Sequence, residues 1–176
     1  MTVSRTGPQA GRLTLHTGVE GRLSRLGHAL DLELREWEAD VEVDGGALVA
    51  VSVSADLLSL HVLGGHGGVT PLSPLDRAAI RRNALKVLHA EARPLARFTA
   101  SSVTARPGGF EVAGTLVVAD ADREVVAAVD LADRVRVGLQ ITHSRFALTP
   151  YSTMRGGLRV RDAVDVRLDL ARPAAE

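Results

Sequence analysis

The dominant pattern along the chain is a strict alternation of apolar and polar residues. Between Asp133 and Arg145 the odd positions read Val135, Val137, Leu139, Ile141 and His143, whereas the even positions are polar or glycine. Alternation with period two over this length predicts a strand with one dry face and one wet face. The same pattern recurs in segments 12–16, 30–34, 37–43, 49–54, 110–118, 125–131 and 163–170. We therefore expect an all-β protein.

Breaks in this alternation predict how the strands are connected. The apolar phase slips at Arg35–Glu36, which indicates a β-bulge or a sharp corner. Short glycine- and aspartate-rich turns separate the other segments. Many one-sided strands with short turns favour an antiparallel meander that closes into a barrel or folds into a sandwich. Gly64–Gly68 is interpreted as a mobile loop, because glycine tolerates positive φ.

One segment has helical periodicity. Ser73 is a candidate N-cap, Pro74 follows at the first helical position, and Asp76 stands three residues after the cap. Apolar residues then recur at helical spacing as far as about His89, namely Ile80, Ala84, Val87 and Leu88. We expect one helix over residues 73–89 that plugs one end of the barrel or covers its flank.

Composition narrows the class of protein. With 176 residues and 45% hydrophobic residues, the chain suits one folded domain. We assign it to residues 11–171, with flexible ends at 1–10 and 172–176. Lys plus Arg and Asp plus Glu both number 21, so net charge gives no argument for binding nucleic acid or an anionic membrane. No signal peptide or membrane span is visible, which predicts a cytoplasmic protein.

Candidate chemistry is sparse. There are no cysteines, and His61 and His66 lack the spacing of a metal site, so no metal or cofactor is expected. No nucleophile elbow or phosphate-binding loop is present. His28 and His143 lie on the apolar phases of their segments, either as satisfied core histidines or as polar anchors for a ligand. Aromatic residues make up only 3%, and an aliphatic interior suits a prenyl or acyl chain.

Several stretches, taken together and in order, resemble the YceI-like family of lipid- or polyisoprenoid-binding proteins. They include Gly21–Leu30 (GRLSRLGHAL), Gly64–Leu72 (GGHGGVTPL) and Ser144–Tyr151 (SRFALTPY). The remaining stretches are 37–41, 94–101, 112–116 and 157–166. The set is most similar to an unsecreted, actinobacterial-type branch. The resemblance implies an extended, lipocalin-like antiparallel barrel of about eight strands with a helix at one end. It also implies an apolar tunnel for an isoprenoid, such as a quinone or polyprenyl compound, and a homodimer.

The resulting hypothesis is a lipid carrier rather than an enzyme. Residues on the dry phases and in the family-like stretches are predicted to line one tunnel: Leu15, His28, Leu32, Val51, Phe98, Val112, Val137, Leu139, His143 and Phe146. Two alternatives stay open. One is an enzyme acting on an amphipathic substrate with His28 or His143 as general base. The other is a solidly packed structural or stress-related module.

Overall fold

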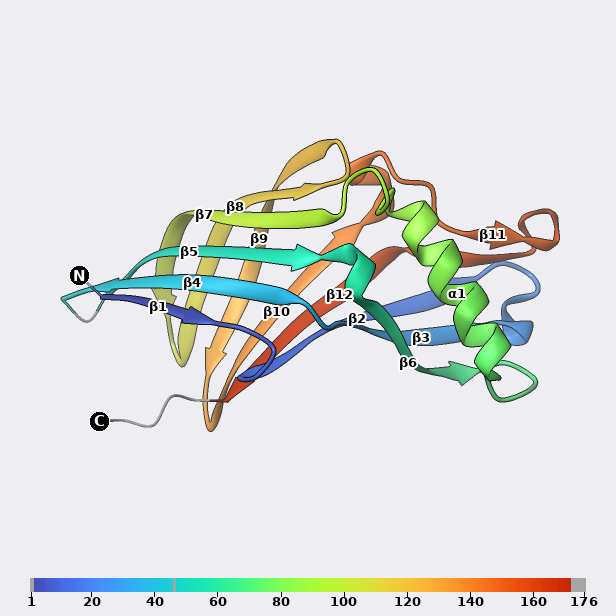
Figure 1. Cartoon of the computed structure of the whole chain (residues 1–176), viewed down its shortest axis with the longest axis horizontal. Helices are drawn as coiled ribbons and strands as arrows, with labels where there is room; N and C mark the ends of the chain where they lie inside the picture. Colours follow the sequence, from blue (N-terminus) through green and yellow to red (C-terminus); the bar gives the residue numbers. More distant parts are fainter. Residues whose placement is uncertain (1, 46, 172–176) are drawn as a thin grey trace.

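A computed structural model describes residues 2–45 and 47–171 (Figure 1). One long helix, α1 (Pro74–Val87), accompanies an antiparallel sheet, and short 3₁₀ turns include η1 (Ser24–Leu26), η2 (Leu57–Ser59), η3 (His143–Phe146) and η4 (Met154–Gly156). The strands are β1 (Thr2–Thr6), β2 (Gly11–Glu20), β3 (His28–Leu34), β4 (Trp37–Asp44), β5 (Ala47–Asp56), β6 (Leu60–Gly67), β7 (Leu95–Arg106), β8 (Gly109–Val118), β9 (Ala121–Leu131), β10 (Arg134–Thr142), β11 (Ser152–Thr153) and β12 (Leu158–Ala171).

The sheet is curled but its hydrogen-bonded path is open. Its order is β1-β4-β5-β7-β8-β9-β10-β12-β2-β3-β6, with β11 added to β12, and each pairing is antiparallel. The path therefore begins at β1 and ends at β6, which makes a half-barrel. The predicted all-β, lipocalin-like fold with one helix is confirmed. The sheet has 12 strands rather than about eight, because β1, β6, β7 and β11 carry too little apolar alternation to be recognised.

The predicted phase slip is a sharp corner. At Arg35 and Glu36 the chain leaves β3 and enters β4, which pairs with different strands. Both backbone N–H groups donate to Ser59 Oγ at 3.0 Å, and Ser59 lies in η2, where β5 turns into β6. One hydroxyl thus holds the two bends together. Residues on either side of the slip face the same interior although their sequence phases differ.

The glycine-rich segment is mostly a strand rather than the predicted loop, although Gly67 and Gly68 do have the positive φ that glycine tolerates, 79° and 73°. Gly64 and Gly65 lie inside β6, opposite Asp31 and Leu30 of β3. A Cβ atom at Gly65 would lie 2.9 Å from Leu72 Cδ1, so glycine makes room for the packing of the following loop. Glycine has no side chain to alternate, and for this reason period-two analysis cannot detect such a strand.

The predicted flexible N-terminus also needs correction. Residues 2–6 of the segment 1–10 form β1, paired with β4 from Thr2 opposite Val43 to Thr6 opposite Ala39. Arg5 joins Asp40 through two hydrogen bonds of 2.7 and 2.9 Å. The segment is polar and mostly exposed, so its pairing leaves no hydrophobic signal in the sequence. The segment 172–176 lies outside the described residues.

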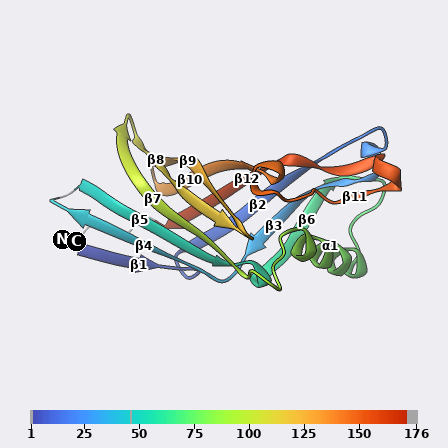
Figure 2. The same ribbon diagram turned by 90° about the horizontal axis from the view of Figure 1, so that it is seen from above.

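Helix α1 begins as predicted and covers the free edge of β6. Ser73 and Asp76 form a complete capping box with Pro74 in the first turn. Arg77 donates to the carbonyl oxygens of Val62 and Leu63 at 3.0 and 2.7 Å. Arg81 donates to the carbonyl oxygens of residues 60 and 58 at 2.8 and 2.6 Å. Figure 2 shows α1 alongside β6, at the end opposite the β4–β5 turn. Three of these four carbonyls belong to β6, so the arginines occupy acceptors that an edge strand otherwise exposes.

Candidate apolar cavity beneath helix α1

An apolar cavity of about 130 Å³ lies between α1 and the inner face of the half-barrel. Its sheet wall comes from two neighbouring rows of side chains that cross the strands. In one row Leu15 lies opposite Leu32, and in the next Ile141 lies opposite Val164 and Val164 opposite Thr17. The helix contributes its predicted apolar stripe, namely Ile80, Ala84, Val87 and Leu88. The sequence therefore identified the helical face that meets the cavity.

A third row of side chains packs the interior next to the cavity. Leu13, Leu34, Leu60 and Leu168 follow one another across adjacent strands, and each is at most 8% exposed. A second apolar cluster around Phe146 and Leu148 of the η3 region lies on the other side. The cavity lies between these two packed regions, which confines it to the helix end of the barrel.

Polar groups at the cavity are few and come from separate elements. Asn83 lies within the apolar stripe of α1, three residues after Ile80. Thr142, His143 and Tyr151 come from the chain around η3. Thr17 Oγ1 accepts a hydrogen bond from the Leu30 backbone N–H at 3.2 Å. A few polar groups in a largely apolar wall are typical of sites that orient an amphipathic ligand.

The protonation pattern of His143 follows from its partner. Nδ1 lies 2.8 Å from the backbone carbonyl oxygen of Asp162, and a carbonyl only accepts, so Nδ1 carries the proton. In the neutral ring, Nε2 is then an acceptor. Among the described residues no hydrogen bond reaches Nε2. The site thus offers an imidazole lone pair, which suits a ligand that donates a hydrogen bond.

Asp162 holds the beginning of η3 in place. Its carboxylate accepts from the Ser144 backbone N–H at 2.8 Å and from the Ser144 hydroxyl. These hydrogen bonds, that from the hydroxyl first, hold the pKa of Asp162 below its usual range. Together with the carbonyl bond to His143, they fix the orientation of the ring. Asp162 is therefore a positioning residue for the cavity.

The structure brings together four of the ten predicted tunnel residues: Leu15, Leu32, His143 and Phe146. The other six do not line this cavity in the described part of the chain. Val112 is buried, Val137 packs against the row that contains Leu34, and Leu139 and Phe98 pack against the Phe146 cluster. Val51 lies on β5, farther from the helix, and is partly exposed. Strand phase assigns a residue to the inner face, but only packing decides whether space remains beside it.

His28, a predicted ligand anchor, instead holds a surface loop. Its Nε2 lies 2.8 Å from the carbonyl oxygen of Thr70 and therefore donates to it. A Cβ atom at Gly68 would clash with the ring at 2.3 Å, so the loop packs directly on the imidazole. Among the cavity residues that were not predicted, Ile141 and Val164 share the apolar phases already assigned to their strands. Asn83 was detectable as a polar residue in the helical stripe.

A separate polar cluster lies on the outer face of β2, β3 and β6. Asp31 accepts from His16 Nδ1 at 2.7 Å and from His66 Nε2 at 2.6 Å. These bonds, that from His16 first, lower the pKa of Asp31 against the opposing effect of burial. Thr14 Oγ1 lies 3.2 Å from His16 Nε2. No group of His, Asp and Glu suitable for a metal ion occurs among the described residues, His61 and His66 included.

The fold and the cavity define a class: a lipocalin-like half-barrel with an apolar pocket under helix α1. The sequence matches the YceI-like domain over residues 8–171. The chain belongs to the YceI-like family. No curated protein matches it. No helix among the described residues is long and apolar enough to cross a membrane.

Solved structures show the same fold at low sequence identity. BcnA of Burkholderia cenocepacia superimposes with a TM-score of 0.65 and 14% identity, covering 91% of this chain and 94% of that chain. The YceI protein of Campylobacter jejuni gives a TM-score of 0.57 and 14% identity, covering 82% of this chain and 85% of that chain. At this identity the comparison concerns the fold alone.

Proposed function

We propose that this protein binds an amphipathic lipid, most simply an isoprenoid, with an apolar portion in the cavity beneath α1. The single observation that carries the proposal is an aliphatic cavity lined by His143, whose Nε2 has no hydrogen-bond partner among the described residues. The cavity of about 130 Å³ is close to the roughly 150 Å³ that accommodates a benzene-sized molecule in an engineered apolar cavity. It suits one or two isoprene units rather than a complete polyprenyl chain.

The polar end of the ligand belongs near Tyr151 in this proposal. Tyr151 lines the cavity and is 42% exposed, so the cavity approaches the surface beside it. A head group there would meet His143, Asn83 and Tyr151. Because His143 Nε2 accepts, a hydroxyl head group fits better than an ether or a carbonyl. Burial contributes ~0.8 kcal/mol per CH₂ and one hydrogen bond ~0.5–1.5 kcal/mol, so the chain provides affinity and the histidine provides selectivity.

The test is a titration with geraniol, monitored by calorimetry and by native mass spectrometry. We expect the parent to bind, and Leu15→Trp, which fills the cavity, to lose binding by at least about tenfold. Val51→Trp is the matched control on the same sheet and should bind as the parent does. Failure of the parent to bind would favour a solidly packed module. If Leu15→Trp bound geraniol as tightly as the parent does, the binding site would not be the cavity beneath α1.

Head-group selectivity is tested with His143→Phe. The parent should prefer geraniol over geranyl methyl ether, and the variant should lose about tenfold of that preference while keeping most of its affinity for the ether. If the parent chemically converted the bound alcohol and the variant did not, the protein would be an enzyme with His143 as general base rather than a lipid carrier. The predicted homodimer, the cytoplasmic location and the absence of nucleic-acid binding stay predictions.

A further inference from the structure

We infer that the helix end of the barrel docks on an anionic lipid membrane. Three segments that are distant in sequence converge there: the β2–β3 turn (residues 21–27), the loop from β6 to α1 (residues 68–73) and the turn around η4 (residues 154–157). We call these three segments, with the first residues of α1 and Tyr151, the docking tip. This inference does not depend on the proposed ligand, because it concerns a surface rather than the cavity.

Contacts between the segments hold the docking tip together. The Leu23 backbone N–H donates to the carbonyl oxygen of Gly157 at 2.8 Å, which joins the first and third segments. Gly27 packs so closely on Leu158 that an added Cβ would lie 2.5 Å from its side chain. His28 joins the second segment through its bond to the carbonyl of Thr70. The three turns therefore form one ordered surface.

The docking tip exposes large apolar side chains. Val69 is 72% exposed and Leu75 83%, one on the loop before α1 and the other in its first turn. Met154 is 50% exposed on η4, Leu26 is 44% exposed on η1, and Tyr151 is 42% exposed beside the cavity. Exposed apolar side chains clustered at one end, with a tyrosine among them, are typical of surfaces that enter the interfacial region of a bilayer.

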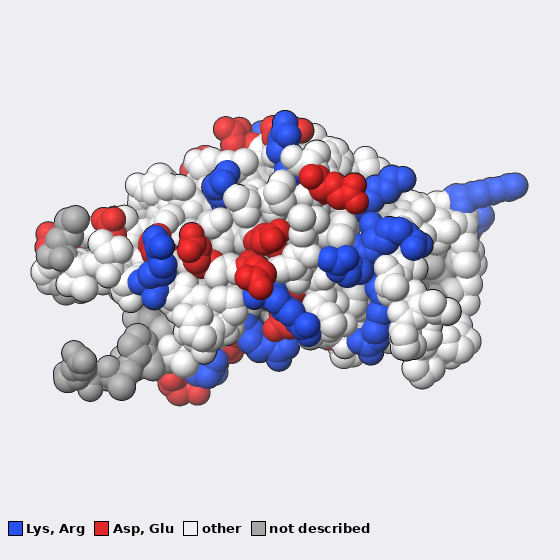
Figure 3. All heavy atoms as spheres, in the orientation of Figure 1, with Lys and Arg blue, Asp and Glu red and all other residues white. Residues whose placement is uncertain are grey.

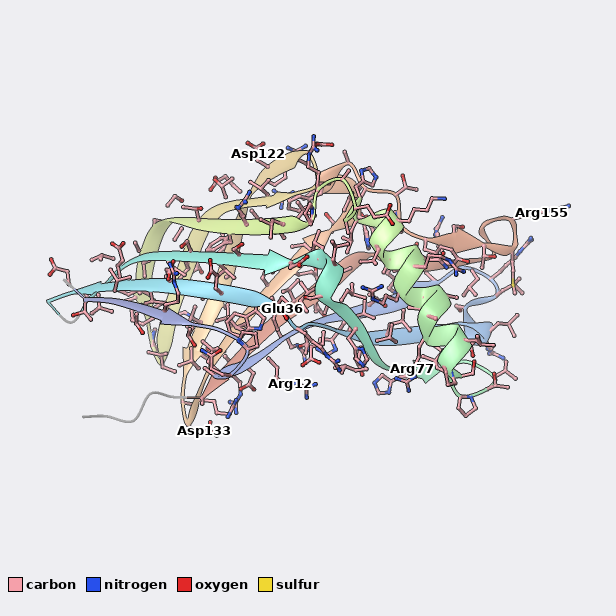
Figure 4. All side chains as sticks on the ribbon, viewed as in Figure 1. Arg12, Glu36, Arg77, Asp122, Asp133 and Arg155 are labelled. Atoms are coloured by element: carbon pink, nitrogen blue, oxygen red, sulfur yellow. The ribbon has the colours of Figure 1, made fainter. Side chains whose placement is uncertain are left out.

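The charge of the docking tip is positive although the net charge of the chain is zero. Arg22, Arg25 and Arg155 are exposed and form no ion pair with any described residue. Glu20 is neutralised by Arg159 at 2.6 Å, and the carboxylate of Asp76 is used in the helix cap. Figure 4 shows Arg155 projecting from this end, and the face in Figure 3 carries blue and white atoms there, with red atoms toward the middle and left.

These features fit a membrane better than a protein partner. Arginines beside an anionic bilayer contribute roughly equal, additive attraction, and isolated apolar side chains can enter the headgroup region without a matching pocket. At Met154 and Arg155 the backbone has φ of 51° and 54°, and both residues are exposed. Since Tyr151 also borders the cavity, docking would place the cavity next to a source of lipid.

The test is flotation of the complete, ligand-free protein with vesicles of phosphatidylcholine containing about 30% phosphatidylglycerol. We expect flotation with these vesicles and little with pure phosphatidylcholine. Removing one arginine should weaken partitioning about fivefold, so Arg25→Gln/Arg155→Gln should weaken it about 25-fold. Arg97→Gln/Arg167→Gln is the matched control, because both arginines are exposed, make no side-chain ion pair with the described residues and lie outside the docking tip.

A second variant separates insertion from attraction. Val69→Ser/Leu75→Ser should reduce flotation severalfold at high salt, where electrostatic attraction is screened. If the control double variant lost as much flotation as the tip double variant, the inference would be overturned. Such a result would show that the vesicles attract any exposed arginine, wherever it lies on the protein. Absence of flotation with either kind of vesicle would also overturn it and would favour a protein partner. Geraniol uptake without flotation would leave the proposed ligand site intact.

Discussion

The two ends of the half-barrel have the same alternation of side chains but differ in burial. At the helix end and the middle of the barrel, Leu34 and Trp37 are 5% and 6% exposed. The open end is formed by the β4–β5, β7–β8 and β9–β10 turns (Figure 1), and there Val49 and Leu131 are 50% and 40% exposed. Alternation assigns each side chain to a face, but burial also needs something to cover that face. Within residues 2–45 and 47–171, only the helix end has a long helix to do so.

The β4–β5 hairpin shows the same contrast within one pair of strands. Trp37 and Ala39 are buried, whereas Val41 and Val43, in the same phase, are only partly so. A bulge between Glu42 and Val43 sets Leu48 opposite Val43 and leaves Val49 unpaired. An unpaired bulge residue turns away from the phase of its strand. Side chains therefore become more exposed toward the open end for two reasons. In the part of the chain that the structure describes, no helix covers them there, and the bulge changes the pairing register of β4 and β5.

The largest effect should come from equal truncations at the two ends. Leu34→Ala removes a side chain from the packed interior row and should lower the free energy of unfolding by about 2–5 kcal/mol. Leu131→Ala at the open end should lower it by less than about 1 kcal/mol, because that side chain is 40% exposed. Urea denaturation measures both. Similar losses in the two variants would show that the open end is covered in solution.

A smaller effect should follow from loosening the helix. Arg81→Met keeps the apolar stem but removes two hydrogen bonds, one to the carbonyl of Leu60 in β6 and one to that of Leu58 in η2, and it should cost about 1–2 kcal/mol. Amide exchange in α1 should accelerate more than exchange in β8. Arg82→Met, one residue along the same helix and exposed, should stay within about 0.5 kcal/mol of the parent. If the two variants lose the same amount of stability, the hydrogen bonds of Arg81 do not hold α1 against the sheet.

The smallest effect concerns the outer face at the helix end. The folded-state pKa of Asp31 is lowered, chiefly by the hydrogen bond from His16, so its contribution to stability is present above the ordinary carboxyl pKa. That contribution is lost as the pH falls through the lowered folded-state value. Asp31→Asn should therefore be less stable than the parent near neutral pH, and the difference should shrink in acid. A difference in urea midpoint that is constant between pH 6 and pH 3 would contradict this.

The local chemistry of the sequence determined much of the fold. Apolar alternation identified β2–β5, β8–β10 and β12, and the Ser73–Asp76 capping box with its apolar stripe identified α1 and the face that it presents to the cavity. The slip at Arg35–Glu36 identified the corner. These features depend on neighbouring residues, and their periods can be read directly from the chain. Strands built of glycine, such as Gly64–Gly67, or of exposed polar residues, such as β1, leave no such period.

The tertiary structure alone decided where the interior is empty and what each histidine does. His28 and His143 look equivalent in sequence, since each follows the apolar phase of a strand. Their roles separated only when His28 met the carbonyl of Thr70 in a surface loop and His143 met that of Asp162 beside the cavity. Likewise, zero net charge concealed three arginines at one end that form no ion pair with the described part of the chain. Cavities, hydrogen-bond partners and charge distribution depend on residues far apart in the chain, and only folding brings those residues together.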